Sequence, residues 1–197
     1  MPKSTEDVTF RNEDWYAEEL TDRHFVGCEF FHVDLTEAVS RGAVFTGCTF
    51  GNVLFNASRH LDSAFTRCTF KRCNFFEAEF TGCKLVGSVF SECDLRPLTV
   101  AGGDWSFVAL PGADLRGVRF TDVRMREIDL TGAHLTGATV TGVDLSGAQL
   151  TGVRLSGADL RGSDLTALDP VSVERAGAII DAEQAVIVAQ ALGFQIG

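Results

Sequence analysis

The sequence contains no long apolar run and fewer basic residues than acidic ones. No stretch approaches the ~20 apolar residues that a membrane-spanning helix needs. The opening segment, MPKSTEDVTF, has no apolar core of the kind found in a secretory signal peptide. These absences predict a soluble, cytoplasmic protein that does not associate with a membrane.

Basic residues are the minority charge: 17 Lys and Arg stand against 27 Asp and Glu, which gives a formal net charge of −10. Such a chain is repelled by the phosphate backbones that attract basic proteins, so direct nucleic-acid binding is not expected. A basic partner is compatible with this charge, including a protein surface that normally holds DNA. The acids gather at the two ends: residues 1–40 carry ten acids and three basic residues, and residues 140–197 carry seven and three.

Recognised catalytic and metal-binding motifs are also absent. The sequence has no CxxC or HxxxH spacing and no GxSxG, Walker A or GxGxxG motif in a suitable context. The four histidines are scattered and stand at no catalytic spacing from a Cys or Asp; they are His24, His32, His60 and His134. We therefore expect neither an enzyme nor a cofactor or metal site.

The sequence is instead built on a period of five residues. Residues 141–160 read TGVDL SGAQL TGVRL SGADL, and the same frame extends in both directions without a slip. Every fifth residue from Trp15 to Leu165 is large and apolar, except Ser40 and His60. The residue two places before each large one is usually small or branched.

Neither a helix nor a plain strand explains this period. A helix of 3.6 residues per turn cannot keep every fifth residue on one face, and a strand alternates with period two. Apolar spacings of two and then three are typical of a short extended piece followed by a turn, with two residues inward and three outward. Glycine recurs at the turn, as at Gly132 and Gly137, where a positive φ is often needed.

Residues from about 10 to 167 resemble the pentapeptide repeat proteins, whose pattern is roughly A(D/N)LxG. The resemblance implies an all-β solenoid, a right-handed quadrilateral β-helix with four pentapeptides, or 20 residues, in each of about eight coils. It divides the chain into an N-terminal extension (1–9), the β-helix (10–167) and a C-terminal helical cap and dimerisation segment (168–197).

In such a solenoid, residues 20 apart stack about 4.8 Å from one another. One expected ladder comprises Phe10, Phe30, Phe50, Phe70, Phe90, Leu110, Leu130 and Leu150. Ser40 and His60 fall in one column on neighbouring coils. They predict a local irregularity, such as a bulge or a lumen that is open to water.

The six cysteines all occupy the small inward position of the repeat. They are Cys28, Cys48, Cys68, Cys73, Cys83 and Cys93. Their even number and stacked columns leave disulfides or zinc as alternatives, but a cytosolic chain stays reduced. Because a buried free cysteine behaves as a small apolar residue, we predict that these cysteines pack in the core.

Beyond Leu165 the repeat frame stops, and helix signals begin. Asp169-Pro170 is a favourable start and predicts a short helix through about Ala176. Asp181 with Gln184 forms a capping-box pattern that predicts a second helix, ending near Leu192.

This second helix is apolar on nearly every side and must be buried on more than one of them. One side can cap the open end of the solenoid, and the other is expected to meet a second copy in a two-fold homodimer, with a monomeric cap as the alternative. The residues expected at this dimer interface are Ala185, Val186, Val188, Ala189, Leu192 and Phe194.

Two segments, GSVFSECDLRPLT (87–99) and the tail LDPVSVERAGAIIDAEQAVIVAQALG (168–193), are similar to mycobacterial fluoroquinolone-resistance members of the family. The plasmid-borne Qnr members share the fold but carry projecting loops, which this unbroken frame lacks. The resemblance implies a dimeric rod that binds DNA gyrase by imitating duplex DNA, inhibits or modulates it and protects it from fluoroquinolones.

Outward acids just before the large residues could replace phosphates in this role. The candidate gyrase-binding residues are Asp14, Asp34, Asp94, Asp104, Asp114, Asp144, Asp159, Asp164 and Asp169. Those at the centre of a tail-to-tail dimer, Asp144, Asp159 and Asp164, are expected to matter most. A purely structural role, hydrogen bonding near the turn, is the alternative for each.

Two other functions remain compatible with the sequence. One is immunity against a toxin or natural product that acts on gyrase. The other is a structural or adaptor solenoid that is unrelated to gyrase.

Overall fold

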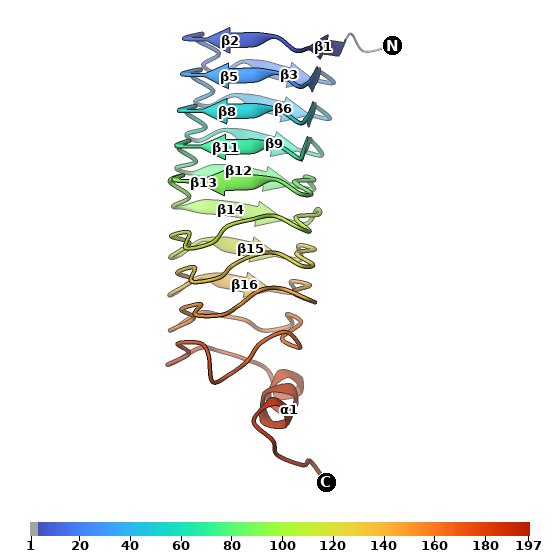
Figure 1. Cartoon of the computed structure of the whole chain (residues 1–197), viewed down its shortest axis with the longest axis vertical. Coiled ribbons are helices and arrows are strands. Elements are labelled where there is room, and N and C mark those ends of the chain that lie inside the picture. Colours follow the sequence, from blue (N-terminus) through green and yellow to red (C-terminus); the bar gives the residue numbers. More distant parts are fainter. Residues whose placement is uncertain (1–3) are drawn as a thin grey trace.

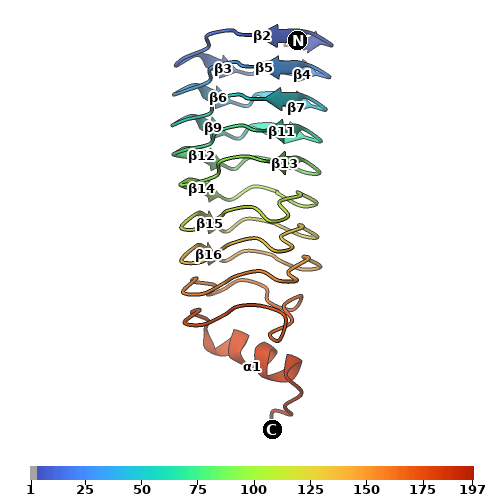
Figure 2. The ribbon, with the colours of Figure 1, turned by 60° about the vertical axis from the view of Figure 1, so that its left-hand side comes forward.

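In the computed structural model, which describes residues 4–197, the chain winds into an elongated stack of coils that ends in a single helix (Figure 1). Strand β1 (Ser4–Glu6) and the C-terminus lie at opposite ends of this rod, and a second view shows the same stacking (Figure 2). No helix among the described residues is long and apolar enough to cross a membrane.

Three faces of the rod are parallel sheets of very short strands. The first contains β1 (Ser4–Glu6), β4 (His24–Val26), β7 (Val44–Thr46) and β10 (Ala64–Thr66). The second contains β2 (Thr9–Arg11), β5 (Glu29–Phe31), β8 (Thr49–Gly51), β11 (Thr69–Lys71) and β13 (Val89–Ser91). The third contains β3 (Glu19–Thr21), β6 (Val39–Arg41), β9 (Arg59–Leu61), β12 (Ala78–Thr81), β14 (Leu98–Ala101), β15 (Arg119–Thr121) and β16 (Thr139–Thr141).

The register between neighbouring strands is 20 residues throughout, as in the pairing of Phe10 with Phe30. A fourth column consists of single bridges, beginning with Asp14 to Asp34 and Asp34 to Leu54. Single bridges also extend the first two sheets toward the C-terminus, for example from Lys84 to Asp104. The 20-residue coil with four paired sides is therefore confirmed.

The core is the interior of the rod. The expected phenylalanine ladder is present: ring centroids are 4.9 Å apart for Phe10 and Phe30, 4.8 Å for Phe30 and Phe50, and 4.9 Å for Phe50 and Phe70. Beyond Phe120 the same inward position is filled by aliphatic side chains. Each large side chain buried in this way stabilises the fold by roughly 1.5–3 kcal/mol.

The irregularity expected at Ser40 and His60 is wrong, because the ladder continues through both residues. β6 and β9 pair in register, with Ser40 opposite His60. The polar atoms bond one another: Ser40 Oγ lies 2.8 Å from His60 Nδ1, and Ser58 Oγ lies 3.1 Å from His60 Nε2. Burial lowers the pKa of His60 to about 3, so the ring is neutral and stacks on Phe80.

The coils extend further at both ends than expected. Within the segment 1–9, β1 already pairs with β4, while residues 1–3 lie outside the described chain. The short helix expected from Pro170 to Ala176 is also wrong. Val173 and Ala178 keep the small inward position 20 residues after Val153 and Ala158, so this stretch pairs with the coil before it.

The helix expected after Asp181 is confirmed as α1 (Ala182–Ala191). Asp181 is its N-cap, and the capping box with Gln184 is complete. The C-cap is Leu192, and Gly193 follows with a φ of 89°, the left-handed conformation in which glycine commonly terminates helices.

Candidate interaction surface

The nine aspartates predicted to bind a partner share one local structure. Each stands one place before an inward residue, and its Oδ1 accepts a hydrogen bond from the backbone N–H two residues later. The donor–acceptor distance ranges from 2.8 Å at Asp34 to 3.4 Å at Asp94. The other seven such aspartates are Asp14, Asp104, Asp114, Asp144, Asp159, Asp164 and Asp169. The structural role considered for each aspartate is therefore real, and it leaves the second carboxylate oxygen free of the turn.

The nine carboxylates do not form one continuous surface. Asp14 and Asp34 are direct neighbours in the column of single bridges, but Leu54 and Asn74 separate them from Asp94. A second face carries Asp104, Asp144 and Asp164, with Arg124 between the first two. Asp159 and Asp169 lie on the two remaining faces.

Four of the nine aspartates are paired with arginines. Asp104 lies 3.4 Å from Arg124, Asp144 lies 2.6 Å from Arg126 and Asp159 lies 2.7 Å from Arg161. Asp114 lies 2.7 Å from Arg116 and 3.2 Å from Arg96. Hydrogen bonds from Arg116 hold the pKa of Asp114 below its usual range, and those from Arg161 do the same for Asp159.

The other five have no cationic group within ion-pair distance among residues 4–197. They are Asp14, Asp34, Asp94, Asp164 and Asp169. Because a paired carboxylate has part of its charge neutralised, these five present more negative charge to a partner than the four paired ones.

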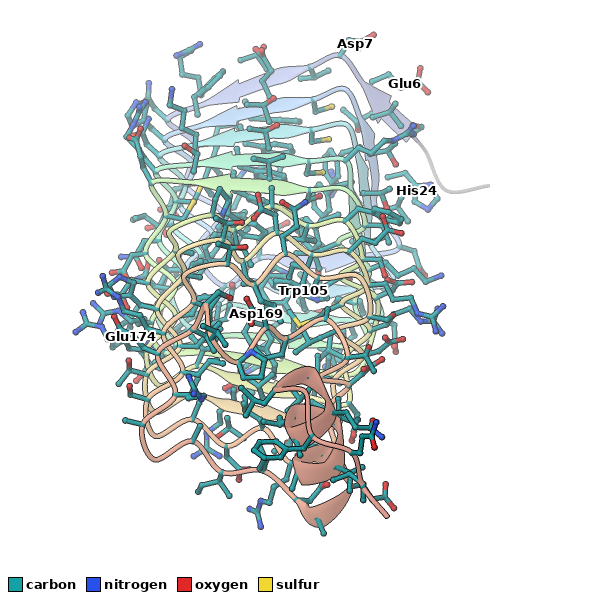
Figure 3. All side chains as sticks on the ribbon, turned by 60° about the horizontal axis from the view of Figure 1, so that its bottom comes forward. Glu6, Asp7, His24, Trp105, Asp169 and Glu174 are labelled. Atoms are coloured by element: carbon teal, nitrogen blue, oxygen red, sulfur yellow. The ribbon has the colours of Figure 1, made fainter. Side chains whose placement is uncertain are left out.

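Acids that sequence reasoning did not single out surround the N-terminal coils. Glu6, Asp7, Glu18, Glu19 and Asp22 are exposed, and none forms an ion pair among the described residues. Figure 3 shows the first two at the N-terminal end of the rod. All seven ion pairs in the described chain lie between residues 72 and 174. The excess of acids within residues 1–40 was the available signal for this surface.

Helix α1 is fastened under the last coil by polar groups. The buried Gln184 donates from Nε2 to Leu160 O at 2.6 Å and to Ser163 O at 2.8 Å, and Asp181 Oδ2 accepts from Gly162 N at 2.8 Å. These bonds satisfy backbone groups that would otherwise be unpaired at the end of the stack. Sequence reasoning found Gln184 as part of the capping box but missed its role as an anchor.

The residues expected at a dimer interface divide between the two sides of α1. Val188 faces the solenoid, where it lines a cavity of 240 Å³ together with Leu160 and Ile180. The exposed members are Ala185, Val186, Leu192 and Phe194, and Ala189 is half-buried. Val171, Ile179 and Ile196 extend the apolar surface at this end, with Val171 76% exposed.

The cysteines pack in the core as expected. All six are free, and only Cys93 is partly exposed. Their thiols donate to backbone oxygens, as Cys83 does to His60 O at 3.2 Å, and burial raises the pKa of Cys83 to about 11. No group of three or more His, Cys, Asp or Glu within residues 4–197 is arranged to hold a metal ion.

Comparison with known families matches the coils to the profile described as pentapeptide repeats, in eight copies over residues 62–96, 106–137 and 128–166. The chain contains a pentapeptide repeat domain. It is 40% identical over 104 residues to the pentapeptide repeat protein MfpA of Mycobacterium tuberculosis (strain ATCC 25618 / H37Rv). That match covers 53% of this chain and 57% of MfpA, so it spans little more than half of that relative.

Two solved structures share the pentapeptide repeat fold along the whole chain. A trypsin-treated variant of QnrB1, a plasmid-mediated fluoroquinolone resistance protein, matches with a TM-score of 0.63 and 15% identity, covering 100% of this chain and 98% of the variant. Full-length QnrB1 matches with a TM-score of 0.55 and 18% identity, covering 98% and 100%. At this identity the likeness establishes the fold alone.

Proposed function

We propose that this pentapeptide repeat protein binds DNA gyrase on the basic surface that holds duplex DNA, inhibits it and protects it from fluoroquinolones. The similarity to MfpA supports this function. The observation that carries it is the set of outward carboxylates without a counter-charge on a narrow rod. Such a rod can act by occupying a surface and needs no catalytic group.

The spacing of the acids suits a surface that reads phosphates. Neighbouring coils place equivalent carboxylates, such as those of Asp14 and Asp34, about 4.8 Å apart. B-DNA presents one charge per ~1.7 Å of axis when both strands are counted. The rod therefore presents a sparser charge than DNA, and the unpaired acids should contribute most of the attraction.

The proposal includes a two-fold dimer through the exposed side of α1. The exposed Val186, Leu192 and Phe194 lie at the end of the rod, and a two-fold pair buries the same apolar patch on both copies. In this dimer Asp164 and Asp169 flank the centre without arginine partners, whereas Asp144 and Asp159 are paired. We therefore expect the unpaired central acids to contribute more to binding than the paired ones.

The dimer is tested by the mass in solution. Leu192→Asp with Phe194→Asp should convert a dimer into a monomer, because both side chains are exposed and the variant can fold. Phe107→Asp is the matched control, since Phe107 is 55% exposed and lies away from the helix. A monomeric mass for the unaltered chain would contradict the dimer.

Gyrase binding is tested by supercoiling of relaxed plasmid with gyrase from the same organism, with and without a quinolone. Aspartate-to-asparagine changes remove the charge and keep the turn bond, as Asn74 demonstrates by accepting from Phe76 N at 2.9 Å. We expect Asp164→Asn with Asp169→Asn to weaken inhibition by roughly tenfold, which corresponds to ~1.4 kcal/mol. Asp144→Asn with Asp159→Asn should weaken it less.

The unaltered protein should inhibit supercoiling and reduce quinolone-induced DNA breaks. If it does neither, the gyrase proposal fails, and the adaptor function becomes the better explanation of the same rod. Equal loss from both pairs of variants would preserve gyrase binding but contradict the role of unpaired charge.

A further inference from the structure

The backbone hydrogen bonds that join successive coils are interrupted midway along the rod, and again in the last coils, where Leu145 and Leu150 make no bond to the next coil in the described chain. Arg72 N–H donates to Ser91 O at 2.9 Å, and Gly112 makes the equivalent bond to the next coil. Between them, Glu92 has no corresponding bond to Pro111 in the described chain. The interruption lies at a corner of the coil.

The adjoining face is interrupted at the same level. Phe75 N–H donates to Asp94 O at 2.8 Å and Leu115 makes the equivalent bond, but Leu95 makes none to Asp114. The bridge column also lacks a link between Asp94 and Asp114. Pro97 follows and has no N–H to donate. Backbone bonding to the next coil is therefore missing from Ser91 to Pro97.

A cleft of 590 Å³ occupies this level. It is lined by Val89, Phe90, Ser91, Glu92, Cys93 and Leu95 on one coil and by Ala109, Pro111, Gly112, Ala113 and Asp114 on the next. The side-chain ion pair that crosses between the two coils here is Arg96 Nη2 to Asp114 Oδ2, at 3.2 Å. Both side chains are more than a third exposed.

The opposite corner of the same level is closed. Asp104 N–H donates to Cys83 O at 2.9 Å, and Leu85 N–H donates to Asp104 O at 2.8 Å. Gly103 lies so close to the Cys83 backbone that a Cβ atom would clash with it. β14 and β15 also remain paired here. The two coils are thus joined along one side and apart on the other.

We propose that this level is a hinge: the corner at Gly103 is the pivot, and the cleft between Cys93 and Asp114 opens and closes. The coils before the hinge are bonded to one another on all four sides, and so are those after it as far as Gln149, so that each part moves as a unit. The proposal does not depend on the partner of the protein.

Opening this hinge breaks few interactions. The N–H groups of Glu92 and Leu95 have no partner among residues 4–197 to lose, and water in the cleft can reach them. What opening must overcome is the Arg96–Asp114 pair and some apolar contact around Phe90. An exposed pair contributes little, so opening belongs to the low-energy motions of the molecule.

The first test is amide hydrogen exchange on the unaltered chain. Glu92 and Leu95 should exchange about 100-fold faster than their counterparts one coil earlier, Arg72 and Phe75, which are hydrogen-bonded. Equal protection at the four amides would overturn the hinge.

The second test measures motion, because a rigid cleft would also exchange quickly. Spin labels at Thr69 and Gln149 span the hinge, and labels at Thr9 and Val89 span the same four coils without crossing it. Both pairs are roughly 19 Å apart on one face. All labelled variants carry Cys93→Ala, which removes the partly exposed cysteine. Alanine is the residue at the equivalent position of the next coil, Ala113. The pair across the hinge should give the broader distance distribution; equally narrow distributions would overturn the proposal even if exchange is fast.

A matched pair of variants tests the ion pair that spans the cleft. Asp114→Asn keeps the turn bond and removes the charge that holds Arg96, whereas Asp34→Asn makes the same change in the same column without touching the cleft. Only Asp114→Asn should broaden the distribution between labels at Thr69 and Gln149. Identical effects of both changes would contradict the idea that the Arg96–Asp114 ion pair holds the cleft closed.

Trp105 offers an optical readout at the hinge. It is the largest side chain of the core, only 1% exposed, and its ring lies parallel to Phe90 with centroids 6.0 Å apart. Its Nε1–H is buried and has no hydrogen-bond partner in the part of the chain that the structure describes. Trp15→Phe leaves Trp105 as the single tryptophan, and opening by Asp114→Asn should shift its emission to longer wavelength. An unchanged emission maximum would count against opening at this level.

Discussion

The coils before and after the hinge form the same 20-residue coil from different residues. The N-terminal part fills its core with stacked phenylalanine rings, and the C-terminal part, apart from Trp105, Phe120 and Met125, uses leucine, valine and isoleucine. Most N-terminal corners place a non-glycine residue at positive φ, among them Asn12, Asn52 and Glu77, whereas glycine dominates from Gly132 onward. Among the described residues, Glu92 is the one acid before the hinge in an ion pair. After it, five acids pair with an arginine: Asp104, Asp114, Asp144, Asp159 and Glu174.

The comparison teaches that the same backbone can be stabilised by two different combinations of core packing and strain at the corners. A non-glycine residue in the left-handed region costs roughly 1–2 kcal/mol. Aromatic pairs contribute roughly 0.5–1.5 kcal/mol beyond the area that they bury, and the N-terminal part has many of them. The C-terminal part has less aromatic packing, but it also has less strain to offset, because its corners are mostly glycine.

The largest expected effect comes from the core. Phe50→Ala should cost about 3–5 kcal/mol, since it removes a ring stacked on both sides as well as buried area. Leu130→Ala in the same column should cost less, because no ring stacking is lost. Denaturant unfolding followed by circular dichroism measures both, and equal losses would show that aromatic stacking adds nothing.

The second effect is a pH dependence of stability that arises in the N-terminal part, from His60. The folded pKa of His60 is lowered to about 3, below its ordinary ~6.5, so its contribution is complete above pH ~6.5 and is lost as pH falls toward 3. Stability should fall by up to about 1.4 kcal/mol per pH unit in this window. His60→Phe, which extends the ring stack, should remove this slope. Melting curves between pH 7 and 4 with parallel slopes for both proteins would contradict a neutral buried ring.

A smaller effect is expected at the glycine corners. A Cβ at Gly142 would meet the Asp122 carboxylate, whereas nothing lies within 4 Å of one at Gly137, and the two φ angles are 64° and 65°. Gly137→Ala should cost about 1–2 kcal/mol from the backbone alone, and Gly142→Ala more. The excess should disappear in the double variant with Asp122→Gly, as unfolding midpoints can show. If Gly142→Ala still costs more than Gly137→Ala in the double variant, the additional cost does not come from the Asp122 carboxylate.

The smallest effect concerns the arginine pairs of the C-terminal part. Hydrogen bonds from Ser146 and Arg126 outweigh burial and lower the pKa of Asp144. A depressed carboxyl pKa stabilises the fold above the ordinary value of ~4, and this is lost as pH falls through the folded value. Asp144→Asn should therefore lower stability at pH 6 by under ~1 kcal/mol and have no effect near pH 2. If the loss of stability in Asp144→Asn is the same at every pH, it comes from the turn hydrogen bonds of residue 144 and not from the ion pair.

The amino-acid sequence by itself determined the features that repeat or are local. The five-residue period specifies which side chains point inward, so the phenylalanine ladder, the buried cysteines and the outward aspartates could all be predicted. Helix α1 was equally accessible, because the Asp181–Gln184 capping box is formed by residues three apart.

Only the tertiary structure decided what depends on the neighbouring coil. Whether Asp144 is paired depends on Arg126, 18 residues away, and His60 Nδ1 is satisfied by Ser40 from the preceding coil. Stacking onto a finished coil also overrode the helix signal at Asp169-Pro170. The hinge has the same origin: the repeat specifies the direction of each side chain, but side-chain volume and backbone fit between coils decide whether two coils bond.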